Sequence, residues 1–444
     1  MKPWVFKRAP RLRAGSPASH VGVGLSRRQF VSSLAAGGAA LAVAPLAKAV
    51  EPPPLSHDKL LDEVERRACL YFQEAADPKT GLVLDRARIE GRETRTVASI
   101  AATGFGLSAM CIGDDRGYLD SKAAKAQVRR TLDQLADETD HERGFFYHFV
   151  DARNGQRIWG SEASSVDTTW LLSGVIHCRE YWDDGGIKRR ANEILDRVDW
   201  RWMMYGTDLL SHGWTPEAGF LPYRWDSYAE LLTMYLMAIG ASESPIPAAS
   251  WHAWKRPMRE IDGVVYIDSA TPLFVHQYSH AWVDFRGRRD KYANYYSNSQ
   301  RATQAHRQFC IDLATKFPWY GPDMWGVTAS DSRVGYRNWG STPTQVDGTL
   351  VPCAAGGSMV FMPDECGLVL KTMLERYGKN VWSKYGFVDA FQPDEPWWSP
   401  DVLGIDLGIM LLMAENSRNS SVWQLMMAAP EVTRAMDAVG LVKI

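Results

Sequence analysis

The sequence has 444 residues with a formal net charge of −2 at pH 7, and 45% of them are hydrophobic. No linker or low-complexity segment divides the chain after its first 58 residues, so one large domain over residues 59–444 is expected. The six cysteines are scattered without a CxxC pair, which argues against a disulfide framework and favours small core residues.

The first 49 residues have the pattern of an export signal. The stretch LSRRQFVSSLAAGGAALAVAPLAKA contains paired Arg27 and Arg28 and a mild apolar run that ends in a small-x-small cleavage site, predicted after Ala49. We therefore predict a twin-arginine signal peptide, the twin-arginine export machinery as a partner, and a periplasmic or secreted location. The apolar run is too short for a convincing membrane span, so no stable membrane insertion is expected, with a membrane anchor as the alternative. A proline-rich spacer, residues 50–58, follows.

Removal of this signal would make the mature chain acidic. Residues 1–49 contain eight basic residues and no acidic one, which leaves 42 basic against 52 acidic residues and a formal net charge of −10. Such a surface repels nucleic acid and anionic polymers as a whole. No nucleic-acid partner is expected, and a neutral ligand fits more easily.

The body of the chain is predicted to be all-α. Runs such as residues 169–182 (TWLLSGVIHCREYW) and 366–378 (CGLVLKTMLERYG) are apolar at helical spacing, and β-branched alternation is rare. Gly240 and Gly378 stand where helices should end.

Acidic residues recur at or just before the apolar runs, at separations of 63, 54, 63 and 59 residues: Asp167, Glu230, Asp284, Asp347 and Asp406. An inner helix, a turn, an outer helix and a return loop take roughly 50–60 residues. A step of 63 residues back from Asp167 reaches Gly104 in a further apolar run, so about 395 residues hold six units. Six helical hairpins that close on themselves form an (α/α)6 barrel, with equivalent acids converging at one end. A chance spacing is the alternative.

Glu230 and Asp406 each stand alone at the start of a nearly uncharged helix. Glu230 begins ELLTMYLMAIG, and the next acid after Asp406 is Glu415, nine residues on. A carboxyl held among apolar groups has a raised pKa, which suits a general acid or base near neutral pH. Bracing of a helix end is the alternative role for each.

Tryptophans gather in the predicted loops. The segment PDEPWWSPD places Glu395, Trp397 and Trp398 among prolines and acids, which argues for exposed rings, although burial is the alternative for any single tryptophan. A flat apolar ring with a polar edge matches the faces of a pyranose. Paired carboxylates and aromatic platforms in a helical barrel favour glycoside hydrolysis, by inversion or by retention.

Residues 272–290 (PLFVHQYSHAWVDFRGRRD) raise a choice between a metal site and a sugar site. His276, His280 and Asp284 are spaced by four and would share about one helical face. However, Gln277 follows His276, so the HExxH pattern is absent, and no cysteine or second histidine pair is near. We expect these side chains to bind sugar hydroxyls or one another in a cleft wall. No metal or other cofactor is expected.

Several ordered motifs resemble the bacterial glycoamylase-like family, whose members include the β-1,2-glucanases of glycoside hydrolase family 144. They extend from about Leu60 to Met427 and include GFFYHFVD, SVDTTWLL, HGWTPEAGFLPYRWDSYAELL, WGVTASD, YGFVDAF and LGIDLGIMLLMAEN. The resemblance implies an (α/α)6 barrel without a metal cofactor. It also implies hydrolysis of a β-linked glucan, most characteristically β-1,2-glucan, with inversion of configuration.

The resemblance also implies roles for single residues. Glu230 is expected to be the general acid and Asp406 the general base, with Asp167 and Glu395 as competitors for the base. The residues expected to bind substrate are His276, Gln277, His280, Trp282, Asp284, Arg286, Trp325, Asp331, Glu395, Trp397 and Trp398.

Two other functions stay open. A polysaccharide lyase on a uronic polymer would use a tyrosine or histidine base and a basic groove. Residues 284–292 (DFRGRRDKY) offer basic side chains, but the charge of −10 counts against a lyase. A non-catalytic periplasmic glucan-binding protein would keep the aromatic residues without a need for Glu230 or Asp406. The sequence does not distinguish endo from exo cleavage.

Overall fold

The computed structural model describes residues 56–269, 272–339 and 346–444. One compact unit, residues 39–444, contains all of them. The predicted signal peptide and its cleavage site lie outside the described residues, as does most of the proline-rich spacer. No helix in the described part of the chain is both long and apolar enough to cross a lipid bilayer.

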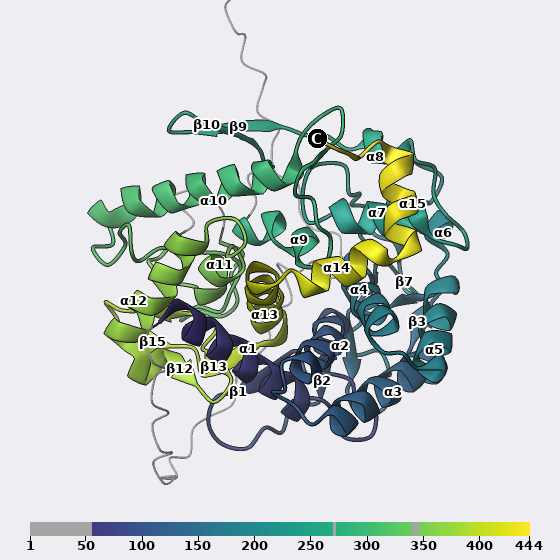
Figure 1. Ribbon diagram of the computed structural model, residues 1–444, viewed down its shortest axis with the longest axis horizontal. Helices are drawn as coiled ribbons and strands as arrows, with labels where there is room; N and C mark the ends of the chain where they lie inside the picture. Colours follow the sequence, from purple (N-terminus) through teal and green to yellow (C-terminus); the bar gives the residue numbers. More distant parts are fainter. Residues whose placement is uncertain (1–55, 270–271, 340–345) are drawn as a thin grey trace, which may run out of the picture. The chain divides into compact units, whose positions relative to one another are not determined.

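Six described helices are enclosed on nearly every side and form an inner ring (Figure 1). They are α2 (Ile100–Asp115), α4 (Ser165–Tyr181), α7 (Leu232–Gly240), α9 (Tyr278–Trp282), α11 (Pro352–Gly356) and α13 (Gly404–Arg418). Their sequences are apolar around most of the helix, and such helices are stable when other elements cover them. Along the ring, α11 contacts α13, α13 contacts α2, α2 contacts α4, α4 contacts α7, and α7 contacts α9.

Six further helices pack around this ring through one apolar face each. They are α1 (His57–Glu74), α3 (Ser121–Asp137), α5 (Gly185–Asp196), α10 (Tyr295–Asp312), α12 (Pro363–Val381) and α15 (Pro430–Val439). Helix α1 packs on α2 and α13, α3 on α2, α5 on α4, α12 on α11 and α15 on α7. Helix α10 packs on the 3-10 helix η2 (Leu273–His276), just before α9. These two layers are an (α/α)6 barrel, which confirms the predicted fold class.

The hairpin repeat is less regular than the sequence predicts. The outer partner of α7 is α15, which lies far along the chain, and not the segment that follows α7. That segment instead holds the short helix α8 (Ser250–Ala253) and a hairpin of β9 (Met258–Ile261) and β10 (Val264–Ile267). Shorter helices connect other parts of the barrel, namely α6 (Trp200–Met204), η3 (Leu313–Thr315) and α14 (Ser421–Ala428).

Short antiparallel strands mark the end of the barrel at which the inner helices begin. The strands β2 (Val97–Ser99), β6 (Ala163–Ser164) and β16 (Asp401–Leu403) run directly into α2, α4 and α13. Their partners are β5 (Phe149–Asp151) for β2, β7 (Gly213–Thr215) with β8 (Gly219–Phe220) for β6, and β1 (Arg86–Arg88) for β16. The other pairs are β3 (His141–Glu142) with β4 (Phe145–Phe146), β11 (Arg288–Arg289) with β17 (Val442–Lys443), β12 (Trp382–Ser383) with β13 (Gly386–Phe387), and β14 (Phe391–Gln392) with β15 (Trp397–Trp398).

Two glycines allow α2 and α4 to pack closely in the inner ring. A Cβ atom added to Gly174 would stand 2.1 Å from the carbonyl oxygen of Gly104, and one added to Gly104 would stand 2.2 Å from the carbonyl oxygen of Trp170. Both obstacles are backbone atoms, which do not move aside as a flexible side chain does. Glycine at both positions therefore permits the helices that carry two neighbouring parts of the barrel mouth to pack closely.

Candidate active site

Several acidic groups meet where the inner helices begin, and Tyr278 marks their meeting point. Tyr278 is the first residue of α9 and is 4% exposed. Burial raises the pKa of its hydroxyl well above the ordinary value. Electrostatic interactions with Asp406, Cys353, Tyr336 and Glu230 raise this pKa further. Side chains from α13, α11 and the segment before α7 thus all act electrostatically on one buried hydroxyl of α9. This convergence defines the candidate active site.

Glu230 reaches this point from the segment just before α7. Its side chain is buried, and the helix that follows contains no charged residue. Buried tyrosines fix the chain on both sides of Glu230. The hydroxyl oxygen of Tyr228 lies 3.2 Å from Nδ1 of His276, and the hydroxyl of Tyr235 donates to the carbonyl oxygen of Trp225 at 3.0 Å. A carboxyl on so firmly held a segment has a defined position, as a proton donor in catalysis requires.

Asp406 is the third residue of α13 and is 6% exposed. Burial raises the pKa of its carboxyl to about 6, hydrogen bonding with Asp389 and Cys353 opposes the rise, and the charges of Asp331 and Asp85 add to it. Its Oδ2 atom accepts no hydrogen bond from any donor in the described residues. Near neutral pH this carboxyl is mostly ionised and can accept a proton, as a general base must.

Asp389 is a member of this cluster that the sequence analysis missed. It follows β13, is 4% exposed, and accepts a hydrogen bond from the backbone amide of Asp331 at 2.7 Å on Oδ2. Burial raises the pKa of Asp389 well above its ordinary value, and the charges of Asp406 and Asp331 raise it further. One signal was present: Asp389 is a single acid among apolar residues in the motif YGFVDAF.

Asp331, a predicted substrate-binding residue, does lie at this mouth. Nη1 of Arg86 donates to both carboxylate oxygens of Asp331 at 3.0 Å, and Nε of Arg86 donates to Asp85 at 3.0 Å. Arg86 lies on β1, which pairs with β16 directly before α13. The arginine therefore holds Asp331 next to the helix that carries Asp406, and its positive charge partly offsets the surrounding acids.

Asp167 occupies on α4 the same place that Asp406 occupies on α13, the third residue of the helix. Its backbone amide donates to Oγ of Ser164 at 3.2 Å, and that hydroxyl donates to Oδ2 of Asp167 at 2.6 Å, so Asp167 helps to cap α4. Nε2 of His148 lies 3.6 Å from Oδ1 of Asp167, and Nδ1 of His148 lies 3.2 Å from Glu162. These three side chains offer oxygen and nitrogen atoms within 4.8 Å of one another. This group differs from the histidine set that the sequence analysis weighed for a metal.

Comparison with known proteins identifies a family that part of this chain matches. Residues 222–430 match the family model Glycoamylase, described as "putative glucoamylase". Residues 222–430 of this chain are thus similar to a glycoamylase-like domain. The predicted family resemblance is thereby confirmed.

Relatives of this glycoamylase-like chain extend over most of its length. This chain is 26% identical over 429 residues to an exo β-1,2-glucooligosaccharide sophorohydrolase (non-reducing end) of Parabacteroides distasonis. The alignment covers 88% of this chain. The chain spans 59% of the length of that relative. Among solved structures, a "putative glucoamylase" from Bacteroides uniformis has a TM-score of 0.83 at 27% identity, covering 88% of this chain and 98% of its own. The endo-β-1,2-glucanase from Chitinophaga pinensis, in complex with sophorotriose and glucose, has a TM-score of 0.80 at 27% identity, covering 87% of this chain and 98% of its own.

Two histidines expected in the cleft wall of this glycoamylase-like chain belong to its core instead. The helix breaks between η2 and α9, so His276, His280 and Asp284 do not share a face. His276 is 2% exposed and lies 3.6 Å from Oδ1 of Asp268 through Nε2. His280 is 1% exposed, its Nε2 lies 3.0 Å from the hydroxyl of Ser299, and burial lowers its pKa to about 3. The prediction that they bind sugar is wrong because both are enclosed by other side chains.

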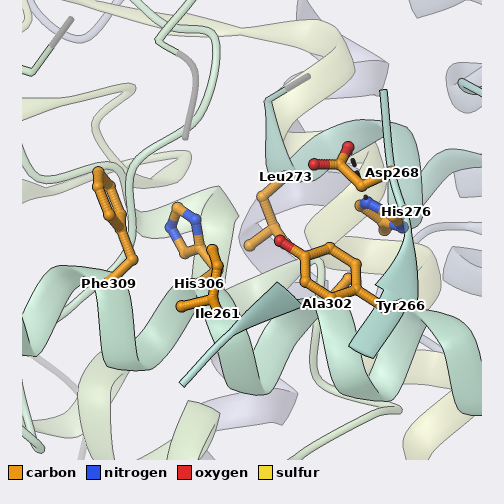
Figure 2. A pocket seen from close by; sticks show the side chains of 8 residues that line it. All are labelled: Ile261, Tyr266, Asp268, Leu273, His276, Ala302, His306 and Phe309. Atoms are coloured by element: carbon orange, nitrogen blue, oxygen red, sulfur yellow. Dashed lines mark ion pairs between the residues drawn. The ribbon is translucent and has the colours of Figure 1, made fainter. Parts of the chain in front are cut away.

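His276 does line a small cavity beside α10, drawn in Figure 2. Its lining residues are Ile261, Tyr266, Asp268, Leu273, His276, Ala302, His306 and Phe309. The space is about 10 Å³, which is room for a single water molecule and not for a sugar ring. Burial also lowers the pKa of His306 to about 3, so this histidine stays neutral at ordinary pH.

Three further predicted binding residues are buried in the barrel core. Gln277 is 0% exposed and donates to the carbonyl oxygen of Ala354 at 2.9 Å. Trp282 is 0% exposed, donates to the hydroxyl of Ser108 at 2.9 Å, and stacks on another indole. Trp325 is also 0% exposed. Because no part of these side chains reaches solvent, the prediction that they contact substrate is corrected.

Asp284 and Arg286 lie at the other end of the inner ring. Asp284 follows the C-terminal end of α9 and accepts two hydrogen bonds from Arg286 at 2.9 Å. The Arg286 guanidinium stacks over Trp423 of α14, with 4.1 Å to the ring centroid. Helix α14 follows the C-terminal end of α13, whereas the candidate site lies where α13 begins. Neither residue is therefore part of the mouth. The prediction failed because the spacing of acids along the sequence does not tell which end of a helix an acid occupies.

The predicted aromatic platform is only partly exposed. Trp397 and Trp398 form β15 and are half-buried, and Trp398 stacks on Phe391 with ring centroids 5.9 Å apart. Glu395 is exposed and pairs with Arg333. Glu395 is thus a surface ion-pair residue, which makes it a poor competitor for the base beside the buried Asp406.

Proposed function

We propose that this protein is a glycoside hydrolase that cleaves β-1,2-glucan or β-1,2-gluco-oligosaccharides. The observation that carries the proposal is the pair of buried carboxyls, Glu230 and Asp406, that both raise the pKa of the buried Tyr278 at one end of an (α/α)6 barrel. A glucan-binding protein without activity would have no use for two buried, desolvated acids at one point. The activities of the similar proteins, which act on β-1,2-linked glucans, supply the linkage.

In the proposed reaction, Glu230 donates a proton to the glycosidic oxygen as the bond to the anomeric carbon breaks. Asp406 accepts a proton from the attacking water, and the carbon inverts. The pKa of about 6 for Asp406 suits this role, because the carboxylate is mostly ionised at pH 7 and is still basic enough to take a proton. Asp331, half-buried and held by Arg86, is placed to accept hydrogen bonds from sugar hydroxyls.

The test is a product assay with the purified chain on linear β-1,2-glucan. Glu230→Gln and Asp406→Asn are the test variants, and Glu375→Gln, on the exposed face of α12, is the matched control. We expect short gluco-oligosaccharides from the parent and the control, and none from either test variant. The size of the products distinguishes endo from exo cleavage, and the anomer formed first, observed by NMR, distinguishes inversion from retention.

Other outcomes of the same assay separate the alternatives. Unsaturated products that absorb in the ultraviolet would indicate a lyase, and binding of the glucan without turnover would indicate a binding protein. If Asp406→Asn forms product at the parent rate, Asp406 is not the general base, and Asp167 becomes the candidate for that role.

Export by the twin-arginine route is a further part of the proposal, supported by Arg27 and Arg28 and the small-x-small sequence before residue 50. Its test is the full chain with Arg27→Lys and Arg28→Lys together, expressed in a bacterium with a twin-arginine pathway. We expect the parent in the periplasm or medium and the double variant in the cytoplasm. Equal export of both would refute this route.

A further inference from the structure

Asp389 and Asp406 present two carboxyls to each other inside the barrel mouth. Both side chains are at most 6% exposed, and each lies within hydrogen-bonding reach of the other. Oδ1 of Asp389 and Oδ2 of Asp406 accept no bond from a donor in the part of the chain that the structure describes. Two facing carboxylate oxygens repel, whereas one proton between them makes a hydrogen bond. The pair is therefore expected to hold a single proton.

The surroundings indicate which carboxyl keeps that proton. Asp389 is the more strongly desolvated of the two, and the charges of Asp406 and Asp331 both favour its neutral form, against one backbone amide that favours the charged form. Asp406 receives hydrogen bonds from Asp389 and from the thiol of Cys353, and both favour its charged form. The proton thus belongs on Asp389, with Asp406 as the acceptor.

We propose that Asp389 is a positioning residue that donates a hydrogen bond to Asp406 and holds it ionised and aimed at the attacking water. This inference rests on the proposed function, because it assigns Asp406 the role of base. Asp389 itself is 4% exposed and is bonded to the backbone amide of Asp331, so it is placed behind Asp406 as a supporting group.

Other charged and titratable groups face the pair from every element around it. They are Asp331 from the segment after α10, Asp85 from the segment before β1, Cys353 from α11 and Tyr278 from α9. Glu230, from the segment before α7, acts on Tyr278. Burial keeps the thiol and the phenol neutral. Arg86 of β1 pairs with both Asp331 and Asp85. Among these groups Arg86 alone is cationic, so a change at Asp389 acts on Asp406 in net acidic surroundings.

Two substitutions at this position separate a hydrogen-bond donor from a space-filling residue. In Asp389→Asn the amide nitrogen still donates to Asp406 and the amide oxygen still accepts from Asp331, so we expect kcat within about tenfold of the parent, from the modest worth of one hydrogen bond. For Asp389→Asn we also expect the acid limb of the pH profile of kcat to stay at the same pH as in the parent. In Asp389→Leu the donor is lost, so we expect kcat to fall by about a hundredfold or more and the acid limb to move to higher pH. Thermal unfolding of both variants checks that they fold.

Either of two results overturns the inference. If Asp389→Asn is as inactive as Asp406→Asn, the proton on Asp389 itself moves during the reaction and Asp389 is not merely a donor. If Asp389→Leu loses activity but keeps the acid limb of the parent, Asp389 only fills space.

A measurement without substrate distinguishes failure of this inference from failure of the proposed function. Infrared spectra of the protein labelled with 13C in its aspartate carboxyls detect a neutral buried aspartic acid at pH 7, and the aspartate label excludes Glu65, whose pKa burial raises to about 8. We expect this signal in the parent and its loss in Asp389→Asn. Absence of the signal in the parent, or its persistence in Asp389→Asn, contradicts a proton held by Asp389, whatever the enzyme hydrolyses.

Discussion

Replacement of Asp406 by asparagine should stabilise the folded protein while it abolishes hydrolysis. Burial raises the pKa of this carboxyl from 3.8 to about 6. An acid with a raised pKa in the folded state contributes no penalty below pH 3.8, where it is neutral in both states, and destabilises the fold as pH rises through 6. The shift is about 2 pH units, which corresponds to about 3 kcal/mol of unfolding free energy at pH 7 and above. Asparagine has nearly the same shape and carries no charge, so it avoids this penalty.

The assay is thermal unfolding of the parent and of Asp406→Asn at pH 4 and at pH 8. We expect the variant to unfold at a higher temperature at pH 8, by a few degrees for a chain of this length, and the two proteins to unfold together near pH 4. The matched control is Glu375→Gln, in which an exposed carboxylate is neutralised and little change is expected at either pH. A variant less stable than the parent at pH 8, or a difference independent of pH, would refute the argument that burial of Asp406 is costly.

Three further predictions concern the same mouth and the ring that carries it. The rate constant kcat should fall below about pH 6 as Asp406 becomes protonated, and a pH profile that is flat down to pH 4 would exclude Asp406 as the base. Arg86→Lys keeps the charge but loses the guanidinium that bonds Asp331 through Nη1 and Asp85 through Nε, so kcat/KM should fall about tenfold with little change in Tm; unchanged kcat/KM would show that Asp331 does not bind substrate. Gly174→Ala should lower the unfolding free energy by several kcal/mol or prevent soluble expression, because its Cβ would stand 2.1 Å from a backbone oxygen of α2, whereas Gly185→Ala, with nothing within 4 Å, should be neutral.

The helical ring could be predicted from sequence because its signal is local. Helices such as α4 and α13 are apolar around most of their circumference, and that pattern is visible in the sequence without knowledge of any partner. Asp167 and Asp406 could be placed at helix starts for the same reason, since a lone charge next to an apolar run is visible in the chain. Glu230 likewise precedes its helix, although by two residues and outside the helix itself.

What could not be predicted depends on where chain segments meet. The break after His276 turns the histidines into the core, and no proline or glycine announces it. Asp284 has the correct spacing from Glu230 but lies past the C-terminal end of its helix, because α9 is only 5 residues long. Asp389 belongs to no repeat and becomes notable only beside Asp406, 17 residues further along the chain.

The packing of α15 on α7 has a consequence for how the protein is made. Helix α7 ends at Gly240 and α15 begins at Pro430, so about 190 residues are synthesised between an inner helix and its cover. Arg434 donates to the carbonyl oxygen of Gly240 at 2.6 Å, and Arg179 of α4 pairs with Glu431 at 2.8 Å, so the late helix also ties α7 to α4. Until α15 emerges from the ribosome, the apolar outer face of α7 has no partner and is open to chaperones and to aggregation. The barrel is thus completed only when α15 packs on α7. A chain that ends before residue 430 would leave the apolar outer face of α7 exposed.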